Sequence, residues 1–279
     1  MKSNRLIGTL TALAMTFAAS NTLAGERIIS AGAAVTELII ALEQQDKLVA
    51  VDVTSQLPSD LVLPKIGYHR QLSAEGLLAL GADQLIGSDE MGPDAALDQL
   101  KSAGVSVDIV NTKATAAGLL ERIDEIAELT DAQPQAAALK VQVKNQLQSL
   151  SQQPQADAKK ILFLLIHEGR PANVAGKDTT PNAIIELAGG INPAAEKLTS
   201  YKPLSTEAMV EMQPDIILVS ARSYDKLGGA DEILKRMPML AATPAGQNKQ
   251  FITIDGHALV GGLGLQSLAE AQRIRQLIK

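Results

Sequence analysis

Three consecutive side chains, Tyr68, His69 and Arg70, bring together a phenol, an imidazole and a guanidinium. An ionised phenol is a hard oxygen donor, an imidazole is a nitrogen donor that suits iron, and a guanidinium binds carboxylates through two parallel hydrogen bonds. Gly67 before them permits backbone angles that other residues resist, and Ser73 after them is typical of a helix N-cap. The stretch therefore fits either a polar surface turn or a ligand-binding loop, since binding residues concentrate on loops held by rigid elements.

Few other side chains offer comparable chemistry. The chain has three histidines, three tyrosines and no cysteine, so cysteine-ligated zinc and iron–sulfur sites are excluded. Tyrosine is one of the side chains that ligate haem iron, which makes Tyr68 a candidate axial ligand. His167 ends a continuous apolar run and ranks above His257 as its partner, whereas His69 is an alternative to either ligand. Taken singly, Tyr68 also fits an ordinary boundary residue, and His167 a satisfied histidine beside a buried strand.

Apolar patterning indicates an alternation of strands and helices. In the first half we expect strands at 28–30, 48–51, 84–87 and 105–110, and helices at 36–42, 74–80, 93–103 and 116–129. After a polar break at 152–157 the pattern restarts, with strands at 160–166, 215–220 and 250–254 and helices at 180–187 and 265–278. This alternation predicts an α/β fold with mostly parallel sheets. The glycine-rich stretch 261–264 lacks the spacing of a dinucleotide site and is interpreted as a flexible turn.

The two halves of the chain are similar to each other. Residues 71–88 align without gaps to residues 203–220, at an offset of 132 residues. The identical pairs are Leu72/Leu204, Ser73/Ser205, Glu75/Glu207, Asp83/Asp215 and Ser88/Ser220. Two unrelated units that share capping residues would also match in part, but matched starts and ends favour two similar lobes.

The same offset sets Tyr201 and Lys202 against His69 and Arg70. Arg70 and Lys202 are candidates for the two propionates of a haem, and Tyr201 for lining the pocket rather than binding iron. Glu75 and Glu207 fit the first turns of two helices, where a negative charge suits the helix dipole. Their symmetry suggests a second role at the tips of the lobes.

A long helix at 131–151 separates the two halves and would be roughly 30 Å long. We therefore predict an N-terminal lobe at 25–130, an interlobe helix at 131–153 and a C-terminal lobe at 154–279. In open α/β sheets ligands bind outside the carboxyl ends of the strands, which places the ligand cleft between the lobes. A rigid connecting helix also predicts that the lobes move little when a ligand binds.

The N-terminus indicates export. Residues 1–24 combine Lys2 and Arg5, an uncharged apolar run and a small-residue cleavage site, as a signal peptide does. An uncleaved anchor is the alternative, although the run is short for a membrane span. Without Lys2 and Arg5 the net charge falls from −6 to −8, which disfavours nucleic acid as a partner. No later stretch reaches membrane-spanning length, so no integral membrane segment is expected after signal cleavage.

No constellation typical of an enzyme is present in the sequence. It contains no Gly-x-Ser-x-Gly elbow, no phosphate-binding Gly-x-x-x-x-Gly-Lys loop and no His-Glu-x-x-His zinc motif. The reactive residues that do occur favour ligand binding, and we expect a protein that is not an enzyme.

Three stretches of the chain resemble the periplasmic haemin-binding proteins of bacterial ABC importers, in the helical-backbone class of substrate-binding proteins. They are Gly-Tyr-His-Arg-Gln-Leu-Ser-Ala-Glu at 67–75, Thr-Pro-Asn-Ala-Ile-Ile-Glu-Leu-Ala-Gly-Gly-Ile-Asn at 180–192 and Pro-Leu-Ser-Thr-Glu at 203–207. The first is typical of the haem branch, and the other two are shared with carriers of cobalamin and siderophores. The likeness implies two lobes bridged by one long helix, Tyr68 and His167 as axial ligands, and docking of Glu75 and Glu207 onto arginines of a permease.

The sequence thus predicts a monomeric carrier in the periplasm, which binds ferric haem between its lobes. It would hand the haem to the permease and ATPase of an ABC importer in the inner membrane. One alternative is a carrier of a ferric siderophore or a corrinoid in the same transporter class. Another is a haem-dependent enzyme, which would need an open coordination position that a Tyr68/His167 pair would fill.

Overall fold

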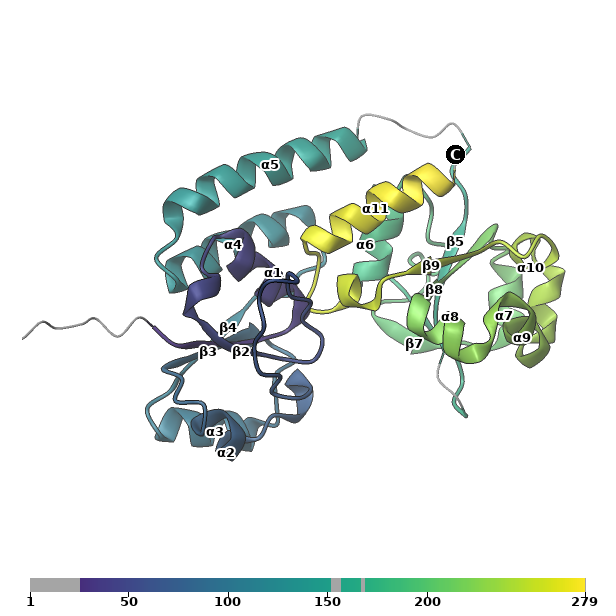
Figure 1. Cartoon of the computed structure of the whole chain (residues 1–279). Coiled ribbons are helices and arrows are strands. Elements are labelled where there is room, and N and C mark those ends of the chain that lie inside the picture. Colours follow the sequence, from purple (N-terminus) through teal and green to yellow (C-terminus); the bar gives the residue numbers. More distant parts are fainter. Residues whose placement is uncertain (1–25, 152–156, 167–168, 279) are drawn as a thin grey trace, which may run out of the picture.

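Short apolar runs form the strands of two sheets, and segments with helical periodicity cover them (Figure 1). The computed structural model describes residues 26–151, 157–166 and 169–278. Within these ranges the chain forms two α/β lobes, each with its own sheet, so the predicted fold class is confirmed. The predicted signal peptide at 1–24 lies outside the described residues.

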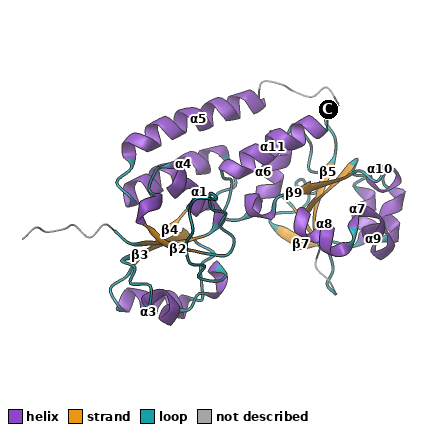
Figure 2. Cartoon of the chain, viewed as in Figure 1, coloured by secondary structure: helices purple, strands orange, loops and turns teal. Residues whose placement is uncertain are grey.

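The sheet of the N-terminal lobe is wholly parallel, with strand order β2-β1-β3-β4. Its elements are β1 (Ile28–Ala31), α1 (Ala33–Ala41), β2 (Leu48–Val51), α2 (Ala74–Leu78), β3 (Gln84–Ser88), α3 (Asp94–Ser102), β4 (Ser106–Val110) and α4 (Ala116–Leu129). Helices α1 and α4 cover one face and α2 and α3 the other (Figure 2). Side chains alternate along a strand, so Leu85 packs on the side of α2 and α3, and Ile86 on the side of α1 and α4.

The C-terminal lobe has a mixed sheet of order β7-β6-β5-β8-β9. Its elements are β5 (Ile161–Leu165), β6 (Asn173–Ala175), α6 (Thr180–Leu187), β7 (Tyr201–Pro203), α7 (Thr206–Glu211), β8 (Ile216–Ser220), α8 (Ala221–Leu227), α9 (Gly229–Arg236), α10 (Pro244–Gln247) and β9 (Phe251–Ile254). Strands β5, β8 and β9 are parallel, as predicted. The antiparallel strands β6 and β7 and the short helices α8 to α10 are additions that the sequence did not predict.

The internal similarity of the sequence corresponds to a repeated structural unit. Strands β3 and β8 begin and end at positions that are 132 residues apart. Helices α2 and α7 before them are capped in the same way: Ser73 Oγ accepts from Gly76 N at 3.4 Å, and Ser205 Oγ accepts from Ala208 N at 3.2 Å. The prediction of two similar lobes is confirmed at this unit.

Two helices connect the lobes. Helix α5 (Gln133–Ser151) passes over the N-terminal lobe toward the C-terminal lobe, as predicted, and α11 (Leu265–Leu277) lies beside it (Figure 1). Arg275 of α11 donates from Nη1 to Leu150 O of α5 at 2.8 Å. The largest apolar cluster runs without a break from Ile86 through Val143 and Ile274 to Phe163, so one core serves both lobes.

No described helix, the 19-residue α5 included, has both the length and the apolar character needed to cross a bilayer.

Candidate ligand-binding site

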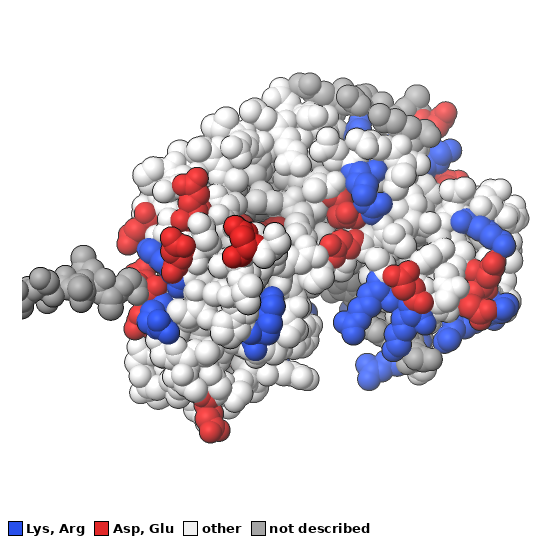
Figure 3. Space-filling model, viewed as in Figure 1, with Lys and Arg blue, Asp and Glu red and all other residues white. Residues whose placement is uncertain are grey.

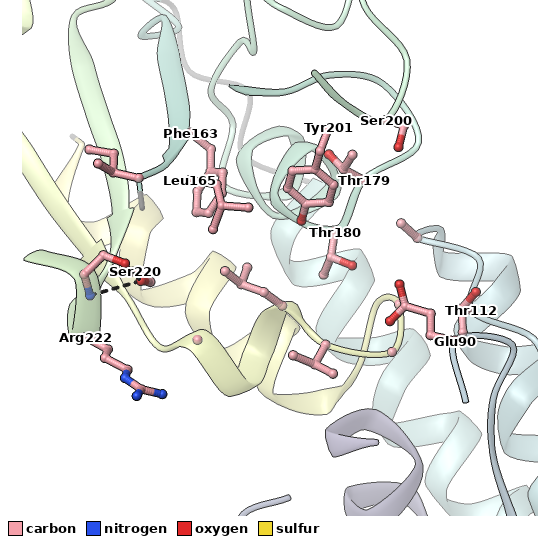
Figure 4. Close-up of a pocket in the computed structure, with 18 of the residues that line it drawn as sticks. Glu90, Thr112, Phe163, Leu165, Thr179, Thr180, Ser200, Tyr201, Ser220 and Arg222 are labelled. Carbon is pink, nitrogen blue, oxygen red and sulfur yellow. Dashed lines mark hydrogen bonds between the residues drawn. The ribbon is translucent and has the colours of Figure 1, made fainter. Parts of the chain in front are cut away.

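A cavity of about 860 Å³ lies between the lobes, and we call it the interlobe cavity. Its volume falls within the range of roughly 300–1,000 Å³ that small-molecule and cofactor sites occupy. Glu90 and Thr112 lie on one side, and Phe163 and Tyr201 lie across from them (Figure 4). Residues 259–262, which we call the floor loop, close the space between the two sides.

Tyr68 lines this cavity from the N-terminal lobe, with 40% of its surface exposed. It has an extended backbone and precedes the 3₁₀ turn His69–Gln71. Gly67 takes a φ of +87°, a left-handed value that favours glycine, and its carbonyl accepts a hydrogen bond from Val53 N at 2.9 Å. The turn therefore fixes the backbone on both sides of Tyr68 and leaves its phenol directed to the cavity.

The ring of His69 lies beside that of Tyr68, with centroids 4.5 Å apart, but the His69 side chain is fully buried. Its Nδ1 donates to Asp52 Oδ2 at 2.8 Å, and its Nε2 lies 3.6 Å from Glu90 Oε2. Burial alone would lower the pKa of His69, but these two carboxylates outweigh it and raise the pKa. His69 therefore does not line the interlobe cavity, because its imidazole is held by acidic partners inside the lobe.

Asp52 anchors this arrangement from the end of β2. Its carboxylate also accepts hydrogen bonds from Thr54 at 2.7 Å and from Ser55 at 2.6 Å. Burial opposes ionisation, but the hydrogen bonds from His69, Ser55 and Thr54 hold the pKa of Asp52 below its ordinary value. A buried polar chain continues from Ser55 through Thr36, so the loop of Tyr68 is tied to the first helix of the lobe.

Glu90 links the buried pair to the cavity. It lines the cavity wall, pairs with Arg70 and faces His69. The imidazole of His69 and the guanidinium of Arg70 together hold the pKa of Glu90 below its ordinary value. Arg70 also lines the cavity. The structure thus brings Tyr68 and Arg70 to the same wall, with Glu90 beside them as a residue that the sequence analysis missed.

Tyr201 and Lys202 differ in their relation to the cavity. Tyr201 lines it, with its ring 6.4 Å from that of Phe163. Burial among these walls and the nearby Glu90 carboxylate raise the pKa of Tyr201, so its hydroxyl is neutral at physiological pH. Lys202 is exposed but is not part of the cavity wall, because successive side chains of β7 point to opposite faces.

Arg222 is a second lining residue that the sequence analysis missed. It lies 132 residues after Glu90, just beyond β8, so matched strand ends carry a carboxylate in one lobe and a guanidinium in the other. Lys226 of the same helix also lines the cavity. Basic side chains gather on the C-terminal lobe beside the hollow between the lobes (Figure 3). The repeat itself was the signal that would have found Arg222.

The two further histidines differ in what the structure describes of them. His167 lies outside the described residues, while Ile166, just before it in the chain, lines the cavity. His257 Nδ1 lies 2.7 Å from Asp255 Oδ1 and 2.9 Å from Gln56 Nε2, and the ring is not part of the cavity wall. Among the described residues, no three His, Cys, Asp or Glu side chains gather into a site for a single metal ion.

Glu75 and Glu207 occupy equivalent places in the repeated unit. Each is exposed in the first turn of its helix, α2 or α7, directly after the capped start. Hydrogen bonds from its own backbone amide and from Ser205 hold the pKa of Glu207 below its ordinary value, so it is ionised at neutral pH. Both carboxylates are available at the surface.

The chain is similar in sequence and fold to proteins whose ligands are known. The periplasmic haem-binding protein HutB of Vibrio cholerae has 61% sequence identity and a TM-score of 0.86, over 91% of this chain and 98% of that one. The periplasmic haem-binding protein RhuT of Roseiflexus sp. RS-1, in its apo form, has 33% identity and a TM-score of 0.82, over 91% and 96%. A vitamin B12-binding protein of Vibrio parahaemolyticus is 25% identical over 216 residues, which are 77% of this chain and 78% of that protein.

The model of the family described as "Periplasmic binding protein" matches residues 28–258. This match includes both sheets and the long helix α5 between them. The chain therefore belongs to the periplasmic binding protein family.

Proposed function

We propose that this protein is a periplasmic carrier that binds ferric haem in the interlobe cavity and delivers it to the permease and ATPase of an ABC importer. The observation that carries the proposal is the exposed phenol of Tyr68 on the cavity wall, held by a buried His69–Asp52 pair. A phenolate oxygen is a ligand of haem iron in proteins. The haem-binding proteins similar to this chain support the same ligand class.

In this proposal the residues of the two lobes make different contacts with the haem. Tyr68 is the axial ligand from the N-terminal lobe, and His167 is the second ligand from the chain that follows β5. Arg70 and Arg222 balance the charges of the two propionates, because guanidinium groups bind carboxylates through two parallel hydrogen bonds. Phe163 and Tyr201 offer aromatic faces against which a flat porphyrin packs. Glu75 and Glu207 are the exposed carboxylates that dock onto the permease.

An absorption titration with ferric haemin tests this proposal, using the mature protein and the variants Tyr68→Phe and His167→Ala. We expect a saturable shift of the Soret band that Tyr68→Phe abolishes and His167→Ala alters. Tyr201→Phe is the matched control, because it removes the other cavity phenol and leaves the iron ligand intact. An unchanged spectrum in His167→Ala would leave Tyr68 as the sole ligand. A wild-type spectrum equal to that of free haemin would refute the proposal.

A corrinoid is the second candidate ligand, because vitamin B12-binding proteins are among the relatives of this chain. A parallel titration with cyanocobalamin decides between them, since a carrier built around Tyr68 should bind haemin far more tightly. Incubation of the haem complex with peroxide tests the enzymatic alternative. A carrier releases its haem unchanged, whereas an enzyme degrades it or turns over a reductant.

A further inference from the structure

The floor of the interlobe cavity also joins the two lobes. Residues 259–262 line the cavity after the 3₁₀ turn Gly256–Leu259, and the chain then runs directly into α11. Between these points it packs against the N-terminal lobe, where Arg122 Nη1 of α4 donates to Leu263 O at 3.0 Å. A change in this joint therefore moves part of the cavity wall.

The glycines of this stretch permit close approach rather than flexibility. A Cβ atom on Gly262 would lie 2.5 Å from Thr112 O, and one on Gly261 would lie 3.3 Å from the Cβ of Ala34. All four residues from 261 to 264 are buried. The interpretation of this stretch as a flexible turn is therefore wrong, since the N-terminal lobe packs directly against its backbone.

Glu37 of α1 completes the joint at the start of α11. Its Oε1 accepts from Leu265 N at 2.6 Å and its Oε2 accepts from Gln266 N at 3.1 Å. A carboxylate at this place satisfies two amides that have no partner within the helix and suits the helix dipole. Gly264 leaves room for it, because a Cβ there would overlap Glu37 Oε1.

We propose that Glu37 is a positioning residue for ligand retention: by capping α11 across the lobe boundary, it holds the floor loop in place beneath the bound ligand. The ligand meant is the haem of the proposed function, on which this inference rests. Glu37 does not line the cavity, so it acts only through the joint. Loss of the cap frees the start of α11 and the floor loop attached to it, and the ligand then leaves faster.

The charges around Glu37 make this role sensitive to pH. Burial raises the pKa of Glu37 to about 7, although the two amides and Arg122 favour the ionised form. Arg122 is in turn faced by Glu125 and Asp89, and burial lowers its pKa to about 10. The carboxylate holds both amides when it is ionised, whereas a protonated oxygen is a poor acceptor for one of them.

Other titratable groups around the joint belong to Asp255 and the turn Gly256–Leu259 that follows it, and to α11. Asp255 and His257 bond to Gln56, and Gln56 Oε1 accepts from Gln266 Nε2 at 2.8 Å. Glu270 accepts from Asp255 N at 3.4 Å and pairs with Arg273. Because Gln56 links His257 to Gln266 at the start of α11, the contribution of His257 must be measured separately.

The test compares haem dissociation from wild type and Glu37→Gln between about pH 8 and about pH 6, with apomyoglobin as the acceptor. We expect the variant to release haem about tenfold faster near pH 8, the size of one lost charge-assisted hydrogen bond. The ratio should fall toward one near pH 6, where wild-type Glu37 is protonated. The ratio cancels any effect of acid on the iron ligands, because both proteins share it.

Two controls and a second variant isolate the joint. Glu43→Gln removes an exposed carboxylate just after the same helix and should leave the dissociation rate unchanged. The double variant Glu37→Gln/His257→Gln is compared with His257→Gln alone. The ratio of their haem dissociation rates should still depend on pH. Gly264→Ala displaces the carboxylate from the other side and should reproduce the fast release of Glu37→Gln.

Amide hydrogen exchange on the haem-free protein separates this inference from the proposed function. Protection of Leu265 N and Gln266 N should be lower in Glu37→Gln than in wild type near pH 8 and equal near pH 6. Equal protection near pH 8 would overturn the inference even if haem did not bind. Lost protection with an unchanged dissociation rate, or a rate ratio that does not vary with pH, would also overturn it.

Discussion

The two lobes carry matched loops, but the charged side chains of these loops differ in whether they bind to other residues of the protein. In the N-terminal lobe, Glu90 forms ion pairs with both His69 and Arg70. The buried carboxylate of Asp52 binds the other nitrogen of His69. In the C-terminal lobe, Arg222 occupies the position matched to Glu90, and no hydrogen bond or ion pair joins its guanidinium to the rest of the described chain. The matched Tyr201–Lys202 segment is held by the β6–β7 ladder instead.

This difference indicates a division of labour between similar units. A loop whose charges are satisfied internally has a fixed geometry before any ligand arrives, which suits a metal-binding side chain such as Tyr68. An exposed guanidinium on a long side chain adapts its position to the charge it meets. One lobe therefore offers a preorganised coordination site, and the other offers a counter-charge for an anionic ligand.

Among these predictions, removal of the buried carboxylate of Asp52 should have the largest effect, which is a loss of unfolding free energy. Asp52→Asn leaves the buried His69 without its anionic partner, and breaking a buried pair in this way costs about 3 kcal/mol or more. Lys202→Ala in the matched segment should change the free energy of unfolding by no more than about 0.5 kcal/mol. Urea unfolding of the two variants measures both values. A loss below about 1 kcal/mol for Asp52→Asn would show that the anchor contributes little.

Arg222 should contribute to haem affinity but not to stability. We expect Arg222→Ala to weaken haemin binding about tenfold, or ~1.4 kcal/mol, through loss of one propionate contact. Arg222→Lys should recover part of this loss because the charge remains, and Lys202→Ala is the matched control away from the cavity. Fluorimetric or absorption titration gives the dissociation constants. Equal effects of Arg222→Ala and Lys202→Ala would remove the distinction between the two positions.

The buried pair should also give the N-terminal lobe a dependence on pH. His69 has a raised pKa, so its stabilisation is fully present below about pH 6.5, the ordinary value, and is lost as the pH rises through the folded pKa. Asp52 has a lowered pKa, so its stabilisation is present above about pH 4 and is lost as the pH falls through the folded pKa. The difference in unfolding free energy between wild type and His69→Gln should therefore shrink above about pH 6.5. A difference that grows with pH would contradict the charged pair.

The smallest expected effect concerns the relative movement of the lobes. Helices α5 and α11 and a shared apolar core join them, so the radius of gyration, about 18 Å for a chain of this size, should change by a few per cent at most when haemin is added. Small-angle X-ray scattering with and without ligand measures this change. A contraction of several ångströms would show that the joint bends as a hinge.

The elements with strong local patterns could be predicted from the sequence, because their burial follows from periodicity. The apolar run that forms β5 and the stripe of α4 are examples, and the repeat of β3 and β8 confirms the predicted pair of lobes. Strands β6 and β7 were missed because each has three residues and no apolar run, and β7 lies at the sheet edge with a proline. The family resemblance of the sequence is confirmed as well.

The site was predictable only in part, because contacts between distant residues decide it. The sequence placed Tyr68, Arg70 and Tyr201 together, and the structure brings all three to one cavity. It left His69 open as a ligand, since nothing local reveals Asp52, which lies 17 residues earlier in the chain. The roles of Tyr68, Arg70 and Tyr201 in ligand binding, and that of His167, remain predictions that the titrations test.

The path of α11 has a consequence for how the protein is made. Glu37 and Leu265 are joined by a hydrogen bond although 228 residues separate them in the chain. A chain made from its N-terminus onward must therefore leave its first lobe incomplete until almost all of it has been synthesised, because Leu263, which accepts from Arg122, and the two amides that bind Glu37 come late in the chain. Such late, long-range closure slows folding, and it makes a chain truncated before Leu265 a ready substrate for chaperones and proteases.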